Sequence, residues 1–197
     1  SQWAGIAARV PADEGEDVSS AQLRTPTWLL GDSALLEQSL PEGAMYDGCV
    51  TSPPYYDLEV YSDQSDDGST LGTYEEFMQW YERIFSQVVD RLRPGSFVVV
   101  KVGDVRDKVG ALRGFVADNV IAFRRLGLHL YNDAILATPA GTAPLRAGRH
   151  FRAGRKLERV HQSVLVFWKG DPRKVNESLG DLPALYVDTT GPDDDAG

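Results

Sequence analysis

The chain has 197 residues, of which 42% are hydrophobic and 25% charged, and this is typical of one globular domain with a sizeable core. A single cysteine, Cys49, excludes an internal disulfide, and the three histidines show no zinc-ligand spacing. No apolar run approaches the roughly 20 residues of a membrane span, and the start of the chain lacks a secretion-signal pattern. We therefore expect a protein of the reducing cytoplasm, with no metal and no membrane partner.

The charges are distributed unevenly along the chain. A net charge of -9 argues at first against a polyanionic partner, since nucleic-acid binders usually carry a basic surface. However, acid is concentrated at 13–17, 57–67 and 193–195. Basic residues crowd one segment, which we call the basic segment, against the single acid Glu158: Arg146, Arg149, Arg152, Arg155, Lys156 and Arg159. The segment predicts phosphate contacts, and a solvated surface loop is the alternative.

The chain begins with residues 1–26, which we predict to be a linker or loop. From residue 9 onward this stretch mixes Pro, Asp, Glu, Gly and Ser without periodicity. Two short apolar runs follow at 27–30 and 46–52. The first ends at Gly31-Asp32-Ser33 and the second at Pro53-Pro54. Both runs predict buried strands that are stopped by turn residues.

The clearest predicted helix begins at Thr73. Thr73 and Glu76 have the spacing of a capping box, in which the hydroxyl accepts a hydrogen bond from the N3 amide and the carboxylate accepts one from the cap amide. Arg93-Pro94-Gly95 ends the helix, and the valine-rich run 96–102 predicts a strand. Apolar residues recur along one helical face: Phe77, Trp80, Tyr81, Ile84, Val88 and Leu92.

The second half of the chain repeats this alternation. A helix is predicted over 112–126, with Gly127 as its C-terminal stop. Strands are predicted over 128–137 and 163–168, and the basic segment is predicted to be a loop between them. We therefore divide the chain into a linker at 1–26, a folded catalytic part at 27–175 and an acidic polar tail at 176–197.

Strands that alternate with helices predict an α/β fold whose largely parallel sheet is covered on both faces. In such sheets ligands bind at the carboxyl ends of the strands. Three polar turns fall at these ends, at 31–33, 52–55 and 103–104. We expect the functional site at this edge of the sheet.

The turn after the second predicted strand contains two consecutive prolines. Each proline removes a backbone donor and fixes φ, and the first also holds Ser52 extended. An exocyclic amino group on a nucleobase is a poor nucleophile, because its lone pair is delocalised into the ring. If the Ser52 hydroxyl and the Pro53 carbonyl accept its two N–H bonds, the nitrogen stays nearer to tetrahedral and can attack a methyl sulfonium. Such a base must be flipped out of a duplex, and Tyr55 is placed to stack on it.

This run, with Tyr46-Asp47 before Thr51-Ser52-Pro53-Pro54-Tyr55, resembles the catalytic motif of the DNA amino-methyltransferases, in which Asp, Asn or Ser precedes Pro-Pro-Tyr or Pro-Pro-Phe. The serine form is commonest in the N4-cytosine enzymes. The similarity extends from about 28 to 173: 30–33 resembles the acidic turn near the cofactor's adenine, 92–95 the turn before the fifth strand, and 161–170 the ending typical of bacterial and phage DNA methylases.

The resemblance implies a Rossmann-like methyltransferase fold with an antiparallel terminal strand, S-adenosylmethionine as cofactor and DNA as substrate. Ser52, Pro53, Pro54 and Tyr55 are then the catalytic loop. Asp32 and Ser33 are then cofactor-binding, although Asp32 alternatively caps the helix that follows it. The targets that stay open are cytosine N4, which the serine favours, and adenine N6. A catalytically silent DNA-binding subunit of a methyltransferase complex is the alternative of a different class.

The sequence departs from this family at one point. The family needs a glycine-rich turn after its first strand, where backbone amides approach the cofactor, and no such turn is found here. We therefore expect the fold to be incomplete, with its first two strands absent. A second segment or chain that carries the glycine-rich half is the predicted partner.

Overall fold

The computed structural model describes residues 26–56, 72–137, 141 and 143–180. The chain divides into two units, 1–30 and 31–197, and the helices and strands described here belong to the second. The tail beyond 180 and the linker before 26 lie outside the described residues. None of the described helices is long and apolar enough to cross a membrane.

The predicted capping box is present at the start of helix α2, Tyr74–Asp90. The Thr73 hydroxyl accepts a hydrogen bond from the Glu76 amide at 3.2 Å, and the Glu76 carboxylate accepts one from the Thr73 amide at 3.0 Å. Both bonds satisfy amides that the first helical turn leaves without an intrahelical acceptor. The helix therefore begins where the sequence predicts.

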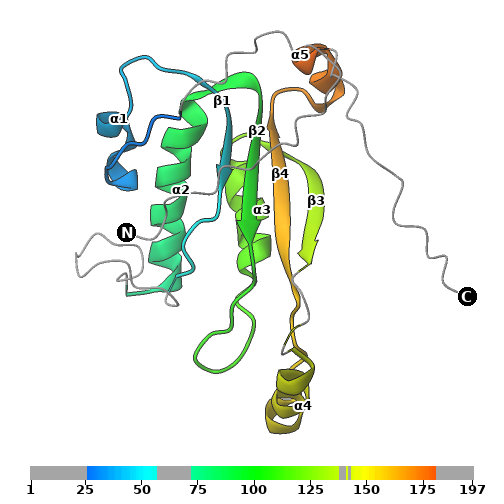
Figure 1. Ribbon diagram of the computed structural model, residues 1–197. Helices are drawn as coiled ribbons and strands as arrows, with labels where there is room; N and C mark the ends of the chain where they lie inside the picture. Colours follow the sequence, from blue (N-terminus) through cyan, green and yellow to red (C-terminus); the bar gives the residue numbers. More distant parts are fainter. Residues whose placement is uncertain (1–25, 57–71, 138–140, 142, 181–197) are drawn as a thin grey trace, which may run out of the picture. The chain divides into compact units, whose positions relative to one another are not determined.

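Four described strands form one sheet in the order β1-β2-β4-β3 (Figure 1). β1 is parallel to β2, and β4 is antiparallel to both β2 and β3. The first three strands in sequence therefore point the same way and the last one is reversed, which confirms the predicted sheet with an antiparallel terminal strand. The strands are β1, Tyr46–Thr51; β2, Leu92–Val102; β3, His129–Ala137; and β4, His161–Lys169.

One face of this sheet is covered by α2 and by α3, Phe115–Arg125 (Figure 1). Val98, Val100 and Val102 alternate onto the covered face of β2 and are fully buried. Aromatic rings from both helices complete this core: Phe77, Tyr81, Phe85, Phe115 and Phe123. The Tyr81 hydroxyl donates to Asn119 Oδ1 inside it, so that this buried polar pair is satisfied.

The opposite face of the sheet is covered less completely. Val99 pairs with Val166 on β4 and with Val50 on β1, and both Val99 and Val166 are half-buried. Val50 is 84% exposed. Near the start of β2 the short helix α5, Val175–Leu179, closes over this end of the sheet, where Trp168 is fully buried.

The predicted strand at 27–30 is wrong. The structure assigns these residues no strand, and Trp28 and Leu30 are almost entirely exposed. A strand forms only when a neighbouring strand supplies hydrogen-bond partners, and composition alone does not provide one. The next residues form a 3-10 turn, η1 (Ser33–Leu35), and one turn of helix, α1 (Leu36–Ser39).

Three further features also differ from prediction. α3 begins at Phe115 rather than at 112, because Asp107 accepts hydrogen bonds from Val109 N and Ala111 N and so holds the preceding residues in a turn. The basic segment is not simply a loop, because much of it forms helix α4, Ala143–Gly154. Ala143, Ala147 and Phe151 do recur at helical spacing, but the glycine at 148 and the many arginines obscure this pattern in the sequence. The predicted tail is helical at its start, since α5 extends to Leu179.

Candidate active site

The loop after β1 follows the carboxyl end of a strand, as predicted. β1 ends at Thr51, and the next residues are not helical or extended in a strand. Pro53 is buried, whereas Ser52 is exposed and Pro54 is half-buried. The turn is therefore anchored by its buried first proline, and Ser52 is left at the surface, where a bound molecule can reach it.

Tyr55 fastens this loop to the end of β2. Its hydroxyl accepts a hydrogen bond from the Gly103 amide at 3.0 Å, and its ring packs edge-on against Phe115 with 5.9 Å between centroids. Gly103 directly follows β2, so this contact joins the carboxyl ends of the two parallel strands. The tyrosine side chain is half-buried, which leaves part of it at the surface.

A cleft of about 300 Å³ opens beside this contact, and we call it the Tyr55 cleft. Because β4 is antiparallel, its first residues lie at the same edge of the sheet as the ends of β1 and β2. The predicted catalytic loop and the end of the basic segment therefore meet in one place. The cleft is lined by Tyr55, Gly103, Asp104, Arg159, His161 and Gln162.

Asp104, which lines this cleft, holds the beginning of α3 by hydrogen bonds. Its Oδ1 accepts hydrogen bonds from the amides of Val105, Gly114 and Phe115, at 2.9 to 3.0 Å. The last two amides belong to the beginning of α3, so the carboxylate caps that helix across the intervening turn. It also fixes the position of Gly103 and, through it, of Tyr55.

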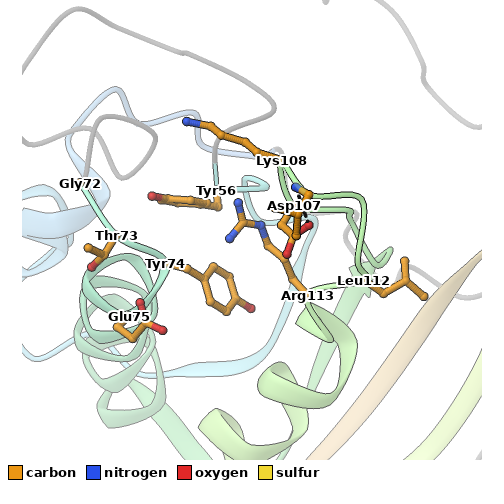
Figure 2. A pocket seen from close by; sticks show the side chains of 10 residues that line it. Tyr56, Gly72, Thr73, Tyr74, Glu75, Asp107, Lys108, Leu112 and Arg113 are labelled. Atoms are coloured by element: carbon orange, nitrogen blue, oxygen red, sulfur yellow. Dashed lines mark hydrogen bonds between the residues drawn. The ribbon is translucent and has the colours of Figure 1, made fainter.

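The residue after Tyr55 anchors the loop a second time. Tyr56 is 8% exposed and its ring contacts Tyr74 and Phe77 of α2, with centroids 5.7 and 5.4 Å away. The Arg113 guanidinium lies over both tyrosine rings, 4.8 Å from the centroid of Tyr56 and 5.2 Å from that of Tyr74 (Figure 2). Consecutive tyrosines therefore tie the loop to two different parts of the fold.

Asp32 and Ser33 lie elsewhere. Asp32 Oδ1 accepts a hydrogen bond from the Ala34 amide at 2.8 Å, so Asp32 caps η1. Gln87 Nε2 donates to the Ala34 carbonyl at 3.1 Å, which places this turn beside the C-terminal half of α2. The predicted catalytic loop is beside the N-terminal end of α2, and the described contacts do not bring the two predicted parts of the site together.

The basic segment carries an internal ion-pair cluster. Glu158 accepts a hydrogen bond from Arg146 Nε at 2.8 Å and lies 2.6 Å from His150 Nδ1. The His150 contact, followed by the Arg146 hydrogen bond, lowers the pKa of Glu158 below its usual range. Arg149 and Arg155 are exposed, and Arg152 Nε donates to Gly148 O at 3.1 Å. A Cβ built on Gly110 would lie 3.2 Å from Lys156 Nζ, so the segment reaches the turn after β2.

Several contacts at this edge were missed by the sequence analysis. The polar pair Gly103-Asp104 was noted at a strand end, and that signal could have suggested Gly103 as an anchor for the loop. Arg113 gives no such signal, because its role depends on two rings that lie far apart in sequence. No group of three or more potential metal ligands is found among the residues that the structure describes.

This fold and site define an α/β domain whose rigid, proline-containing loop follows the carboxyl end of a strand in a mixed sheet. The family model described as DNA methylase, N6/N4 type, matches residues 46–190. The matched region includes the predicted catalytic loop and the four strands that the structure describes. The chain belongs to this family of DNA methylases.

Solved structures share the fold. A putative DNA modification methylase from Thermus thermophilus, solved in complex with S-adenosyl-L-methionine, is 26% identical, with a TM-score of 0.52, over 72% of this chain and 54% of that one. A selenomethionine derivative of the same protein is 26% identical, with a TM-score of 0.51, over 72% of this chain and 51% of the other. This chain therefore spans about half the length of the structures that it matches.

A cytosine-N4-specific PvuII DNA methyltransferase is 22% identical over 83% of this chain and 58% of that chain, with a TM-score of 0.49. A likeness this distant carries no argument about the target base. Among curated proteins, none matches the sequence significantly.

Proposed function

We propose that the chain is the catalytic half of a DNA methyltransferase that transfers a methyl group from S-adenosylmethionine to the exocyclic amino group of a flipped base, with cytosine N4 as the favoured target. The observation that carries the proposal is the loop at 52–55. It follows a strand, is anchored by Pro53 and Tyr55, and leaves Ser52 exposed, and its last residue, Tyr55, lines the Tyr55 cleft. Membership of the DNA methylase family supports the same reaction.

The loop would act by positioning. The Ser52 hydroxyl and the Pro53 carbonyl would accept hydrogen bonds from the two N–H groups of the target base, which holds the nitrogen lone pair toward the methyl donor. Because the Tyr55 hydroxyl is fixed by the Gly103 amide, the loop would not need to reorganise when the base enters. Tyr55 would present the remaining exposed part of its ring to the flipped base.

S-adenosylmethionine, when bound, would supply an electrophilic methyl group. The Asp32 carboxylate and the Ser33 hydroxyl have the chemistry to hold polar groups of this cofactor, and both are exposed. They lie beside the C-terminal half of α2, away from the catalytic loop. The described residues therefore fit the cofactor only in part, and we derive no catalytic step through it.

The remaining part of the cofactor site is proposed to come from a second segment or chain. β1 pairs with one neighbour among the described strands, and Val50 on it is 84% exposed. An apolar strand with a free edge favours the addition of a further strand. The exposed side chains of Trp28 and Leu30 also suit burial against an added segment.

This proposal predicts that the chain alone neither binds S-adenosylmethionine tightly nor methylates DNA. Isothermal titration with the cofactor, followed by size analysis of the same material, tests it. A monodisperse monomer of 21.6 kDa that binds the cofactor at micromolar affinity would contradict the need for a partner.

The role of the loop is tested by Ser52→Ala in the chain together with its complementing segment. We expect turnover to fall by about 100-fold or more, as for the loss of one preorganised hydrogen-bond group, with DNA affinity nearly unchanged. Ser178→Ala is the matched control, since Ser178 is an exposed serine on α5 at the other end of the sheet. Wild-type rates in Ser52→Ala would remove the loop from the mechanism.

The target base is decided by mass spectrometry of nucleosides from treated DNA. N4-methylcytosine is the expected product. Detection of N6-methyladenine would show that adenine is the target instead. Cofactor crosslinking to the assembled complex tests the silent-subunit alternative. Labelled peptides that contain Ser52 support catalysis by this chain, and label confined to the partner supports a silent subunit.

The basic segment is proposed to contact DNA phosphates. Neutralising Arg149, Arg152 and Arg155 together should reduce the slope of log affinity against log salt by about two to three units, at roughly 0.9 per phosphate contact. Arg146 is left unchanged because it is paired with Glu158. An unchanged slope would show that the segment faces away from DNA.

A further inference from the structure

The beginning of β4 forms a second wall of the Tyr55 cleft, opposite the predicted catalytic loop. Gln162, the second residue of this strand, lines the cleft. On one side it pairs with Leu136 of β3. On the other side the next residue, Ser163, pairs with Val102 at the end of β2. A side chain on a strand that is paired on both sides is held more precisely than one on a loop.

Gly103 joins this wall to the predicted catalytic loop. Its amide donates the hydrogen bond to the Tyr55 hydroxyl, at 3.0 Å. A Cβ built on Gly103 would lie 3.6 Å from that hydroxyl and 3.9 Å from Gln162 Cγ, the atom that carries the carboxamide. The tyrosine and the glutamine therefore meet over one glycine, which places no side chain of its own between them.

The carboxamide of Gln162 is available to a ligand. Gln162 is half-buried, and its side chain has no hydrogen-bond partner among the residues that the structure describes. Neither of its polar atoms is enclosed. An amide of this kind offers N–H donors and a carbonyl acceptor to a bound molecule. Asp104 on the same cleft differs, because its Oδ1 already accepts three backbone amides.

The charges and size of the cleft favour an uncharged, planar ligand. Its lining contains one arginine, Arg159, and one aspartate, Asp104. Because these two charges are matched, the cleft has no clear excess of positive charge to hold a phosphate. Its volume of about 300 Å³ is at the lower end of the range for ligand pockets, which suits a single ring system such as a nucleobase.

The nucleobases differ at the ring nitrogen beside the reacting group. In cytosine and adenine, the ring nitrogen next to the exocyclic amino group, N3 or N1, is a hydrogen-bond acceptor. In thymine, the corresponding nitrogen carries a hydrogen and lies beside a carbonyl. Enzymes that flip a base read such differences by hydrogen bonds to its Watson–Crick edge. A fixed amide donor at this point therefore favours a base with a transferable amino position over thymine.

We propose that Gln162 is a specificity residue, whose Nε2 donates a hydrogen bond to N3 of the cytosine that enters the Tyr55 cleft. The inference rests on the proposed function, because a flipped base is its ligand. While the Ser52 hydroxyl and the Pro53 carbonyl accept from the amino group, Gln162 holds the neighbouring ring atom and so fixes the orientation of the base. Adenine N1 satisfies the same donor, so this contact rejects thymine but does not choose between the two amino bases.

The test measures binding of the full chain to short single-stranded oligonucleotides by fluorescence anisotropy, since a single strand needs no base flipping. One oligonucleotide contains only deoxycytidine. The other contains 3-deazadeoxycytidine, in which a C–H group replaces N3 and the amino group remains. The parent should bind the first about 3- to 10-fold more tightly, as expected for one hydrogen bond. Gln162→Met keeps the length of the side chain but removes the amide, so it should bind both oligonucleotides equally.

Two controls separate this contact from general effects on DNA binding. Gln162→Met should leave the slope of log affinity against log salt unchanged, because it removes no charge. Gln79→Met is the matched substitution, since Gln79 is an exposed glutamine on α2 outside the lining of the Tyr55 cleft. It should retain the parent's preference for deoxycytidine. Circular dichroism checks that each variant is folded.

The failures are distinguishable. If Gln162→Met keeps the parent's preference for deoxycytidine, another group reads N3, and the inference is overturned while the proposed function stands. If the parent binds the two oligonucleotides equally, N3 is not read and the inference is also overturned, whereas methylated nucleosides from the assembled enzyme would still support the proposed function. If the parent binds neither oligonucleotide and the assembled enzyme yields no methylated nucleoside, the inference and the proposed function fall together.

Discussion

The two faces of the sheet are built from the same valine-rich strands but have different surroundings. On β2, Val98, Val100 and Val102 are fully buried under α2 and α3, whereas Val99 on the other face is only half-buried. Its neighbour Val50 on β1 is 84% exposed. Strand composition therefore indicates that both faces suit burial, and the elements present decide which face is buried.

The two parts of the predicted site also differ in how this chain holds them. The proposed catalytic loop is tied to the covered face through Tyr56 and Phe77 and to the end of β2 through Tyr55. The turn with Asp32 is held mainly beside α2. The part proposed to meet the target base is thus preorganised by this chain, and the part proposed to meet the cofactor is expected to need another segment.

The largest effect on stability is expected from a substitution on the covered face of the sheet. Phe77 is fully buried and its ring contacts Tyr56, Tyr74 and Phe115. Phe77→Ala should lower the free energy of unfolding by about 3 to 5 kcal/mol, because it leaves a cavity in the core. Urea denaturation followed by circular dichroism measures this. A loss below about 1 kcal/mol would mean that the covered face does not hold the domain together.

A smaller effect is expected at the beginning of the helix that covers this face. Thr73→Ala removes the side-chain half of the capping box, and it should cost about 1 kcal/mol. Thr73→Ser keeps the hydroxyl and should restore most of the loss, which separates capping from side-chain volume. Equal stability of the alanine and serine variants would show that the cap contributes nothing.

The stability that the covered face provides should also decrease at alkaline pH. Burial, then the hydrogen bond to Asp118, raises the pKa of Tyr74 well above its usual range. The unfolded chain loses this proton near pH 10 whereas the folded chain keeps it, so the contribution of Tyr74 is fully present below about pH 10 and falls as the pH rises further. Unfolding titrations between about pH 8 and 11 should show a shallower decline in Tyr74→Phe than in the parent. Identical declines would contradict this assignment.

The smallest effect is expected on the other face. Val50→Thr should change the stability of this chain by no more than about 0.5 kcal/mol, since the side chain is exposed. In the complete assembly the same substitution should weaken pairing along β1, because the position would be buried there. Unfolding of the chain alone and of the assembly compares the two cases. A large loss in the isolated chain would show that the face is already covered.

Local patterns in the sequence were sufficient for much of the fold. The capping box at Thr73, the helical spacing from Phe77 onward and the glycine stop at Gly127 each depend on interactions within a few residues. The loop at 52–55 was located in the same way, since prolines after an apolar run end a strand wherever it pairs. These features could be predicted because their causes are close together along the chain.

Other features depended on contacts between distant residues. The run at 27–30 has the composition of a strand but no described neighbour, and strand formation requires one. The helical spacing of α4 is obscured by its arginines and by Gly148, and the Glu158 contacts with Arg146 and His150 form only once the segment has folded back on itself.

The sequence by itself determined the alternation of strands and helices and the position of the proline loop, because periodicity and turn chemistry are local. Tertiary structure alone decided that Tyr55 accepts a hydrogen bond from Gly103 and that Arg113 lies over Tyr56 and Tyr74. These contacts join residues about 40 to 60 positions apart. Only the parallel pairing of β1 with β2, and the helices packed against them, brings such residues within hydrogen-bonding and ring-contact distance.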